Sequence, residues 1–267
     1  MLLLLHALWT PITLLLFVLV VRPSSNPLAL VAEALHVATS TRGGKLVLWI
    51  AAATIGANFL ECLIEPWLAG ALGYDLTAWV RSVEGATVER VQGTLPAALV
   101  PVAVWFYLAG YVAGLLTPAT VWTVETRFAA AAALVAGYVA NYAIGLPFYF
   151  FAPVQEVAWS GLSDAKPLLD AAFPGLSGET RVGSGLDNCL PSLHVSLTWT
   201  AFFIALARGE SAMRWFTGVV AVLTAYAVMA LGIHWALDVG TGVVLGAACA
   251  GIGLLWARRR ERVSASS

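Results

Sequence analysis

Two histidines and an aspartate stand where the chain passes from polar into apolar sequence. His194 follows Pro191 and Ser192, residue types that commonly begin helices, so we expect His194 in the first turn of a helix. His234 and Asp238 lie four residues apart where a later apolar segment starts, a spacing that puts two side chains on one helix face. An aspartate beside a histidine can accept its ring N–H, fix the tautomer and stabilise the imidazolium. The residues predict a nucleophilic or basic His234 assisted by Asp238, with His194 as an acid.

The same positions favour an anionic substrate, because helix N-termini offer partial positive charge and free N–H groups. Other interpretations stay open. A His–Asp pair at this spacing also occurs as a structural hydrogen bond or as two ligands of a metal site. Ser192 and His194 are two residues apart and do not share a helix face, so helix capping with a phosphate contact suits Ser192 better than nucleophilic attack. Asp187 and Asn188 are turn and capping residues for which a site role is the alternative.

The elements that must position these residues are helices in a membrane. The 267 residues are 60% hydrophobic and 11% charged, whereas soluble domains average about 45–50% and about 25%. A net charge of −1 gives no electrostatic footprint for nucleic acid. We therefore expect an all-α, polytopic transmembrane bundle of about seven spans. The apolar runs long enough to span lie at 2–21, 46–64, 95–116, 128–151, 192–207, 215–232 and 235–256.

The basic residues predict an orientation, because cytoplasmic loops collect lysine and arginine. If the tail 258–267 is inside, the alternation of spans puts ten of the 14 basic residues on that side and four on the other. This predicts a multi-pass protein of the plasma membrane with a cytoplasmic C-terminus. Both histidines then come to the outer or lumenal face, together with two long connections, 65–94 and 152–191. Several glycines and prolines in the second connection predict an irregular cap over that face.

Three regions follow from this reading. Residues 1–45 hold an N-terminal span and a short apolar segment, 28–39, that fits an interfacial or re-entrant piece. Residues 46–257 form the catalytic membrane domain, and residues 258–267 form a basic cytoplasmic tail.

The residues around both histidines resemble the phosphatidic acid phosphatase type 2 (PAP2) superfamily, and within it the inositol phosphorylceramide synthase branch, over about 187–242. Pro191-Ser192-Leu193-His194 is similar to the second family motif, and His234 with Asp238 to the core of the third. The resemblance implies a six-helix core, a phosphohistidine on His234 oriented by Asp238, and His194 as the acid for the leaving oxygen. It implies no metal and no cofactor. The substrate class it implies is a phospholipid, a polyprenyl phosphate or a sphingolipid-like lipid.

The chain departs from the wider family where phosphate would bind. Val228 stands six residues before His234, where that family has an arginine, and the first family motif is absent. Phosphoryl transfer needs cations or donors around the equatorial oxygens. We expect Arg181 to bind phosphate first, with Lys166 in the same loop as the second cation. Tyr142 is expected to add a hydrogen bond, as are its neighbours Asn141 and Tyr149.

The molecule that accepts the phosphoryl-linked group decides which activity the protein has. Water makes the protein a lipid phosphatase, and an alcohol such as inositol makes it a phosphotransferase. Two other classes remain open: a non-catalytic membrane protein that kept the histidines, and a transporter that uses the His–Asp pair as a proton relay.

Overall fold

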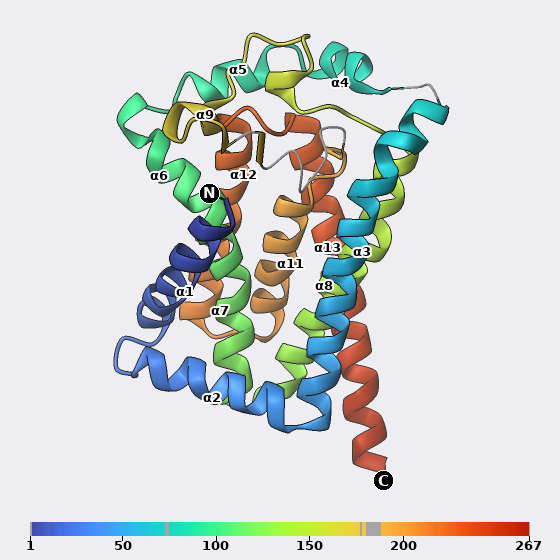
Figure 1. Cartoon of the computed structure of the whole chain (residues 1–267). Coiled ribbons are helices and arrows are strands. Elements are labelled where there is room, and N and C mark those ends of the chain that lie inside the picture. Colours follow the sequence, from blue (N-terminus) through green and yellow to red (C-terminus); the bar gives the residue numbers. More distant parts are fainter. Residues whose placement is uncertain (1, 73–74, 177, 180–187, 267) are drawn as a thin grey trace.

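The computed structural model describes residues 2–72, 75–176, 178–179 and 188–266, and its long elements are all helices. Figure 1 shows the long helices running side by side. The elements are α1 (Leu2–Val21), α2 (Pro27–Ser40), α3 (Arg42–Leu72), α4 (Thr77–Glu84), α5 (Thr87–Gln92), η1 (Ala97–Leu99), α6 (Val100–Trp105), η2 (Phe106–Gly110), α7 (Tyr111–Val124), α8 (Phe128–Phe151), η3 (Val157–Trp159), α9 (Leu168–Ala172), α11 (Leu193–Arg208), α12 (Ser211–Ala230) and α13 (Ala236–Ser266).

Five helices among the described residues are long and apolar enough to cross a membrane. They cover the expected spans 2–21, 95–116, 128–151, 215–232 and 235–256, and they confirm an all-α membrane protein. The second of these spans is longer than expected, since Ala97–Val124 runs on through Pro118. The expected span 192–207 is α11, an apolar helix of 16 residues, and 46–64 lies within α3.

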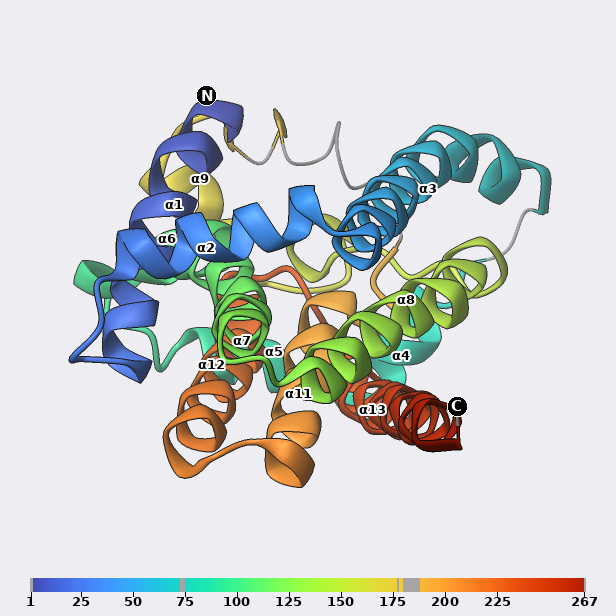
Figure 2. The same ribbon diagram turned by 90° about the horizontal axis from the view of Figure 1, so that it is seen from below.

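The two ends of the bundle differ. At one end α2 crosses the long helices, as Figure 2 shows from below. At the other end α4, α5, η3 and α9 lie over the bundle, and we call this layer the cap and this end the cap end. The cap contains turns at Gly161 and Gly175, which have positive φ values of 68° and 84°, and this confirms the irregular structure expected of the segment after 152.

Helix α11 lies at the centre of the core and packs against α8, α12 and α13. Glycines allow the closest of these contacts. A Cβ on Gly242 would lie 2.7 Å from the Ser192 carbonyl oxygen, and a Cβ on Gly246 would lie 2.7 Å from that of Ser196. Small residues spaced four apart let helix backbones approach in this way. The approach fixes the start of α11 against the start of α13.

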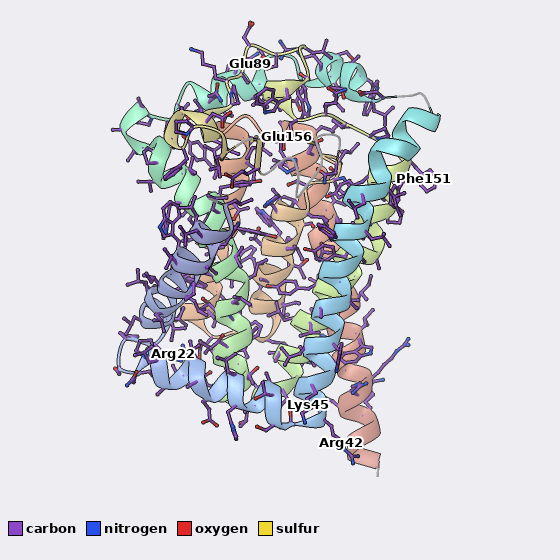
Figure 3. All side chains as sticks on the ribbon, viewed as in Figure 1. Arg22, Arg42, Lys45, Glu89, Phe151 and Glu156 are labelled. Atoms are coloured by element: carbon purple, nitrogen blue, oxygen red, sulfur yellow. The ribbon has the colours of Figure 1, made fainter. Side chains whose placement is uncertain are left out.

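Ion pairs tie the helix ends together at the end opposite the cap. The Arg22 guanidinium donates to Glu125 at 2.5 Å and also to Glu210, which joins the ends of α1, α7 and α12. Arg208 pairs with Glu261 through two bonds of 2.8 and 2.9 Å. Figure 3 shows Arg22, Arg42 and Lys45 at this end, whereas Glu89 and Glu156 lie at the cap end.

Candidate active site at the cap end

His194 lies in the first turn of α11, as expected. Ser192 is the N-cap of this helix, and its hydroxyl oxygen accepts a hydrogen bond from the Val195 N–H at 3.4 Å. The Ser192 N–H donates to the backbone oxygen of Asp238 at 3.1 Å. The capping role predicted for Ser192 is thus confirmed, and this backbone bond brings the start of α11 against the turn of α13 that carries Asp238.

His234 lies in the loop between α12 and α13, not on a helix. Gly232 has a positive φ of 78°, and the N–H groups of Ile233 and His234 both donate to the Val228 oxygen, at 3.0 and 3.1 Å. The expectation that His234 and Asp238 share a helix face was therefore wrong in its geometry. The turn at Gly232 folds the chain back before α13 begins at Ala236.

The His234–Asp238 pair is nevertheless present. The His234 Nδ1 atom lies 3.5 Å from Asp238 Oδ2, which also accepts the Trp235 N–H at 2.9 Å. Both side chains are buried. Neither His234 Nδ1 nor Asp238 Oδ1 has a hydrogen-bond partner within the part of the chain that the structure describes. The pair holds unused polar atoms in a buried place, which is typical of a site that awaits a ligand or substrate.

Burial sets the protonation state of His234. It lowers the pKa of the imidazole from 6.5 to about 4, and a hydrogen bond with the backbone of Cys189 acts in the opposite direction. The ring is therefore neutral at pH 7, and the neutral ring is the nucleophilic form of histidine.

The two histidines lie together, as predicted. Their ring centroids are 5.7 Å apart, with the rings inclined at 61°. His194 is only partly covered, while 4% of His234 is exposed. The two rings are therefore in direct contact, so a small group that binds beside one of them also lies close to the other.

Two tyrosines that the sequence did not single out pack against His194. The Tyr107 and Tyr111 rings lie 5.0 and 4.8 Å from the His194 ring, centroid to centroid. Phe106–Gly110 is a π-helical turn, which widens the helix here, and π-helical turns are frequent at functional sites. Both tyrosines belong to an apolar run with no local signal, so only the packing of the helices shows their place.

Tyr142, predicted to contact substrate, is partly buried and packs against a hydrophobic cluster that contains Leu193, the residue before His194. The neighbouring polar residues of α8 have structural bonds: the Asn141 amide donates to the Gly137 oxygen and to Thr200, each at 2.8 Å. The Tyr149 hydroxyl donates to the Pro191 oxygen at 3.0 Å, which holds the segment just before α11.

The cations predicted to bind phosphate are placed only in part. Arg181 and Asp187 lie outside the described residues. Lys166 is exposed, and its backbone N–H and oxygen bind the Gln92 side chain at 2.8 and 2.9 Å. Its backbone oxygen packs on Gly232, where an added Cβ would approach it to 2.7 Å. Lys166 thus borders the His234 loop through its backbone.

The cap holds the His234 loop at further points. The Ala158 N–H donates to the Gly232 oxygen at 2.9 Å, and the Trp235 indole N–H donates to the Gln155 oxygen at 2.7 Å. Asn188 forms a single parallel β-bridge with Val154 where the chain leaves the cap for α11. The cap therefore fixes the segments before both histidines.

Glu84, at the end of α4, is a third residue near the site that the sequence did not indicate. Its Oε2 accepts the Leu237 N–H in the first turn of α13 at 2.9 Å, and its Oε1 is buried without a partner among the described residues. Burial raises the pKa of this carboxyl, the hydrogen bonds to the start of α13 lower it, and the charges of Asp238 and Glu89 raise it further. A carboxylate distant in sequence thus caps the helix that carries Asp238.

A family model described as the PAP2 superfamily matches residues 128–262, half of the chain. The match covers α8, α11, α12 and most of α13, which are the helices around the two histidines. No curated protein and no solved structure matches the chain.

Proposed function

Because the chain belongs to the PAP2 superfamily, whose members are generally phosphatases and phosphotransferases, we propose that it cleaves or transfers a phosphoryl-linked head group of a lipid. The observation that carries the proposal is the meeting of the His194 ring with the buried His234–Asp238 pair, at 5.7 Å between ring centroids. Neither a proton relay nor an inert scaffold needs a second histidine at this place.

In the proposed reaction the neutral His234 ring attacks phosphorus. A P–N bond forms, the P–O bond to the leaving group breaks, and His194 gives a proton to the leaving oxygen. Asp238 orients His234 and stabilises its positive charge. An acceptor hydroxyl, from water or an alcohol, then gives its proton to His194 and attacks phosphorus, which breaks the P–N bond and restores His234.

We propose that phosphate is bound by the residues that the sequence predicted for this role. We keep Arg181 and Lys166 as the cations, with Asp187, Asn188, Ser192 and Tyr142 as polar contacts. The free N–H groups at the start of α11 support an anion beside His194, because that helix is 16 residues long and its dipole points toward the site.

The lipid reaches the site from the membrane. We propose that α3 and α11 complete seven spans with the five long helices, and that the cap end faces the outer or lumenal side. A phospholipid, a polyprenyl phosphate or a sphingolipid-like lipid would then place its phosphate at the cap end and its chains among the helices.

The test is turnover of a lipid extract by the purified protein in detergent. We expect His234→Ala and Asp238→Asn to lose turnover while remaining folded, and His36→Ala, an exposed histidine on α2, to keep it. Labelled substrate should leave an acid-labile, base-stable phosphoenzyme on wild type and none on the His234 variant. Unchanged turnover in the His234 variant would refute the proposal.

A second arm of this experiment identifies the acceptor. The resemblance to the inositol phosphorylceramide synthase branch suggests an alcohol acceptor, although water and an alcohol would use the same residues of the site. Adding free inositol should then yield an inositol phosphate product, whereas release of inorganic phosphate or a free head group regardless of inositol identifies a hydrolase.

A further inference from the structure

We propose that Cys189, His234 and Asp238 form a binding site for a thiophilic divalent cation such as Zn²⁺, and that the bound ion inhibits the proposed reaction. The inhibitory consequence rests on the proposed function, whereas binding of the ion does not. Cys189 comes from the loop before α11, whereas His234 comes from the loop leading into α13 and Asp238 from the first turn of that helix.

The donor atoms already lie close together. One ligand atom from each of the three side chains lies within 4.8 Å of the other two, and all three residues are buried. Tetrahedral zinc at about 2.0–2.3 Å from N, O and S ligands needs donor separations of roughly 3.5 Å, so the side chains must close by about 1 Å. The Nδ1–Oδ2 distance of 3.5 Å between His234 and Asp238 meets this requirement without movement.

The polar atoms of the pair are available to a ligand. His234 Nδ1 and Asp238 Oδ1 have no hydrogen-bond partner in the described structure, although His234 is 4% and Asp238 0% exposed. The Cys189 thiol donates to the Ile233 oxygen across 3.7 Å, a long contact that a metal–sulfur bond can replace. A buried pair with unused atoms beside a thiol is the independent sign that a ligand fits here.

The donor set selects the kind of ion. Thiolate, imidazole and carboxylate together suit Zn²⁺ and Cd²⁺, whereas Mg²⁺ and Ca²⁺ prefer oxygen ligands alone. On binding, the Cys189 S–H bond breaks, the proton leaves to solvent and a metal–sulfur bond forms, with no change of oxidation state. Three protein ligands leave a fourth position for water.

Such an ion would inhibit rather than catalyse. It would bind Nδ1, the His234 nitrogen that faces Asp238, with the ring proton moved from Nδ1 to Nε2. The nitrogen that attacks phosphorus would then carry the proton, and the ion would separate the two side chains, so the histidine would lose both its orientation and its nucleophilic character. The ion needs no separate route to the site, because in the proposed reaction a lipid phosphate must reach the same residues. The extracytoplasmic concentration of such ions would then control the enzyme.

The experiment uses the full-length protein in detergent, with Co²⁺ alone as a spectroscopic probe. A thiolate ligand gives an intense sulfur-to-cobalt absorption in the near ultraviolet, which Zn²⁺ should abolish by displacement. We expect this band in wild type and in Cys249→Ala, and its loss in Cys189→Ala. Cys249 is the matched control because it is also a buried thiol, packed with Tyr149 and Leu245 in another cluster.

The activity arm measures inhibition by Zn²⁺ and its reversal by a chelator. Cys189→Ala should keep basal turnover and need at least tenfold more Zn²⁺ for half-inhibition, while Cys249→Ala should behave as wild type. Equal inhibition of wild type and Cys189→Ala, or a cobalt band that survives in Cys189→Ala, would overturn the inference. A band lost with Cys189 in a protein that turns over no lipid phosphate would keep the metal site and refute only the proposed function.

Discussion

At the scale of single residues, burial decides the chemistry of His234. A histidine in water is half protonated at pH 6.5, but the site lowers the pKa of His234 to about 4 because its charged form is poorly solvated there. Burial destabilises the charged ring, so the folded protein favours the neutral ring, the form that the proposed nucleophilic role requires.

This pKa predicts how activity depends on pH. Neutral His234 persists as the pH falls below 6.5, so kcat/KM should decline on the acid side only toward pH 4. Stability follows a different course. The unfolded chain takes up the proton near pH 6.5 and the folded chain near pH 4, so this histidine destabilises the fold progressively as the pH falls through that window.

The measurement is a kcat/KM profile with circular dichroism recorded at each pH, so that loss of fold is separated from loss of nucleophile. An acid limb centred at or above pH 6.5 in a folded protein would contradict the role given to His234.

The packing of the two tyrosine rings against His194 leads to a second prediction about a single residue. Tyr107→Ala removes a ring whose centroid is 5.0 Å from that of His194, and a loosened acid misplaced by about 1 Å should lower kcat by roughly 10- to 100-fold. Tyr107→Phe keeps the ring and should keep kcat near wild type. Tyr226→Ala, whose hydroxyl contacts Thr94 at 3.1 Å in the cap, is the control. An equal loss in Tyr107→Phe would mean that the hydroxyl acts, not the ring.

These residues show what the sequence could and could not reveal. His194, His234 and Asp238 stood out because ionisable groups are rare in apolar sequence and their spacing is local. Tyr107 and Tyr111 stood among many apolar residues, and the π-helical turn that aims them has no pattern of its own. The sequence did not single out Cys189. The residues that lie beside it in the structure, His234 and Asp238, are more than 40 positions away along the chain, so no local pattern joins the three.

At the scale of elements, the start of α13 depends on a carboxylate from the cap. Glu84 accepts the Leu237 N–H at 2.9 Å, which satisfies one of the free N–H groups that every helix start leaves. The pairing joins α4 to α13 across the site. Sequence patterns give helix bounds well, as α8 at 128–151 shows, but they carry no sign of such a distant cap.

Substitutions of Glu84 test this cap. Glu84→Ala should lower the free energy of unfolding by about 1 kcal/mol, as loss of an N-cap does, and should also lower kcat because Asp238 lies in the same turn. Glu84→Gln keeps an acceptor oxygen and should retain both. Burial raises the pKa of Glu84, so wild type should lose stability as the pH rises from 4.5 through this raised pKa, and the Gln variant should not.

Thermal unfolding of the three proteins between acid and neutral pH makes the comparison. Parallel curves for wild type and Glu84→Gln would show that the pKa of this carboxyl is not raised in the folded protein.

The close contact of α11 with α13 supplies a matched pair of glycine substitutions. Gly242→Ala brings a methyl group to 2.7 Å from the Ser192 oxygen, and overpacking of this kind typically costs about 1–3 kcal/mol. It should also lower turnover, since Ser192 begins the helix that carries His194. Gly240→Ala lies on the same helix with nothing within 4 Å of its Cβ, so it should be neutral or stabilising by up to about 1 kcal/mol. Equal effects of both changes on unfolding would reject the close approach as the cause.

At the scale of the whole molecule, the two ends carry different chemistry. The cap end holds the histidine pair under a layer of short helices, whereas the opposite end is held by ion pairs of Arg22, Glu125 and Glu210. The apolar runs predicted the long helices, because their periodicity and length are local properties. Glycines and prolines predicted that the cap is irregular, but its arrangement could not be predicted, since it comes from hydrogen bonds between distant loops such as that from the Leu76 N–H to the Pro153 oxygen.

The uneven distribution of the basic residues between the two ends predicts the orientation of the protein in its membrane. Arg22, Arg42 and Lys45 lie at the end opposite the cap, as Figure 3 shows, and the ten-to-four division of the 14 basic residues predicts that this end is cytoplasmic. The orientation can be measured with single cysteines placed at each end of the protein, after Cys62 has been replaced by alanine so that it does not react with the label. Leu162→Cys in the cap and Glu33→Cys on α2 replace exposed side chains.

A membrane-impermeant maleimide should label the Leu162→Cys protein in intact cells and the Glu33→Cys protein only after permeabilisation. The physical reason is the cost of moving many positive charges across the membrane during insertion, which retains the basic end inside. The reverse pattern would place the histidine pair in the cytoplasm and refute an extracytoplasmic substrate, and it would also deny extracellular Zn²⁺ access to Cys189. Labelling of both proteins after permeabilisation controls for the reactivity of the two thiols.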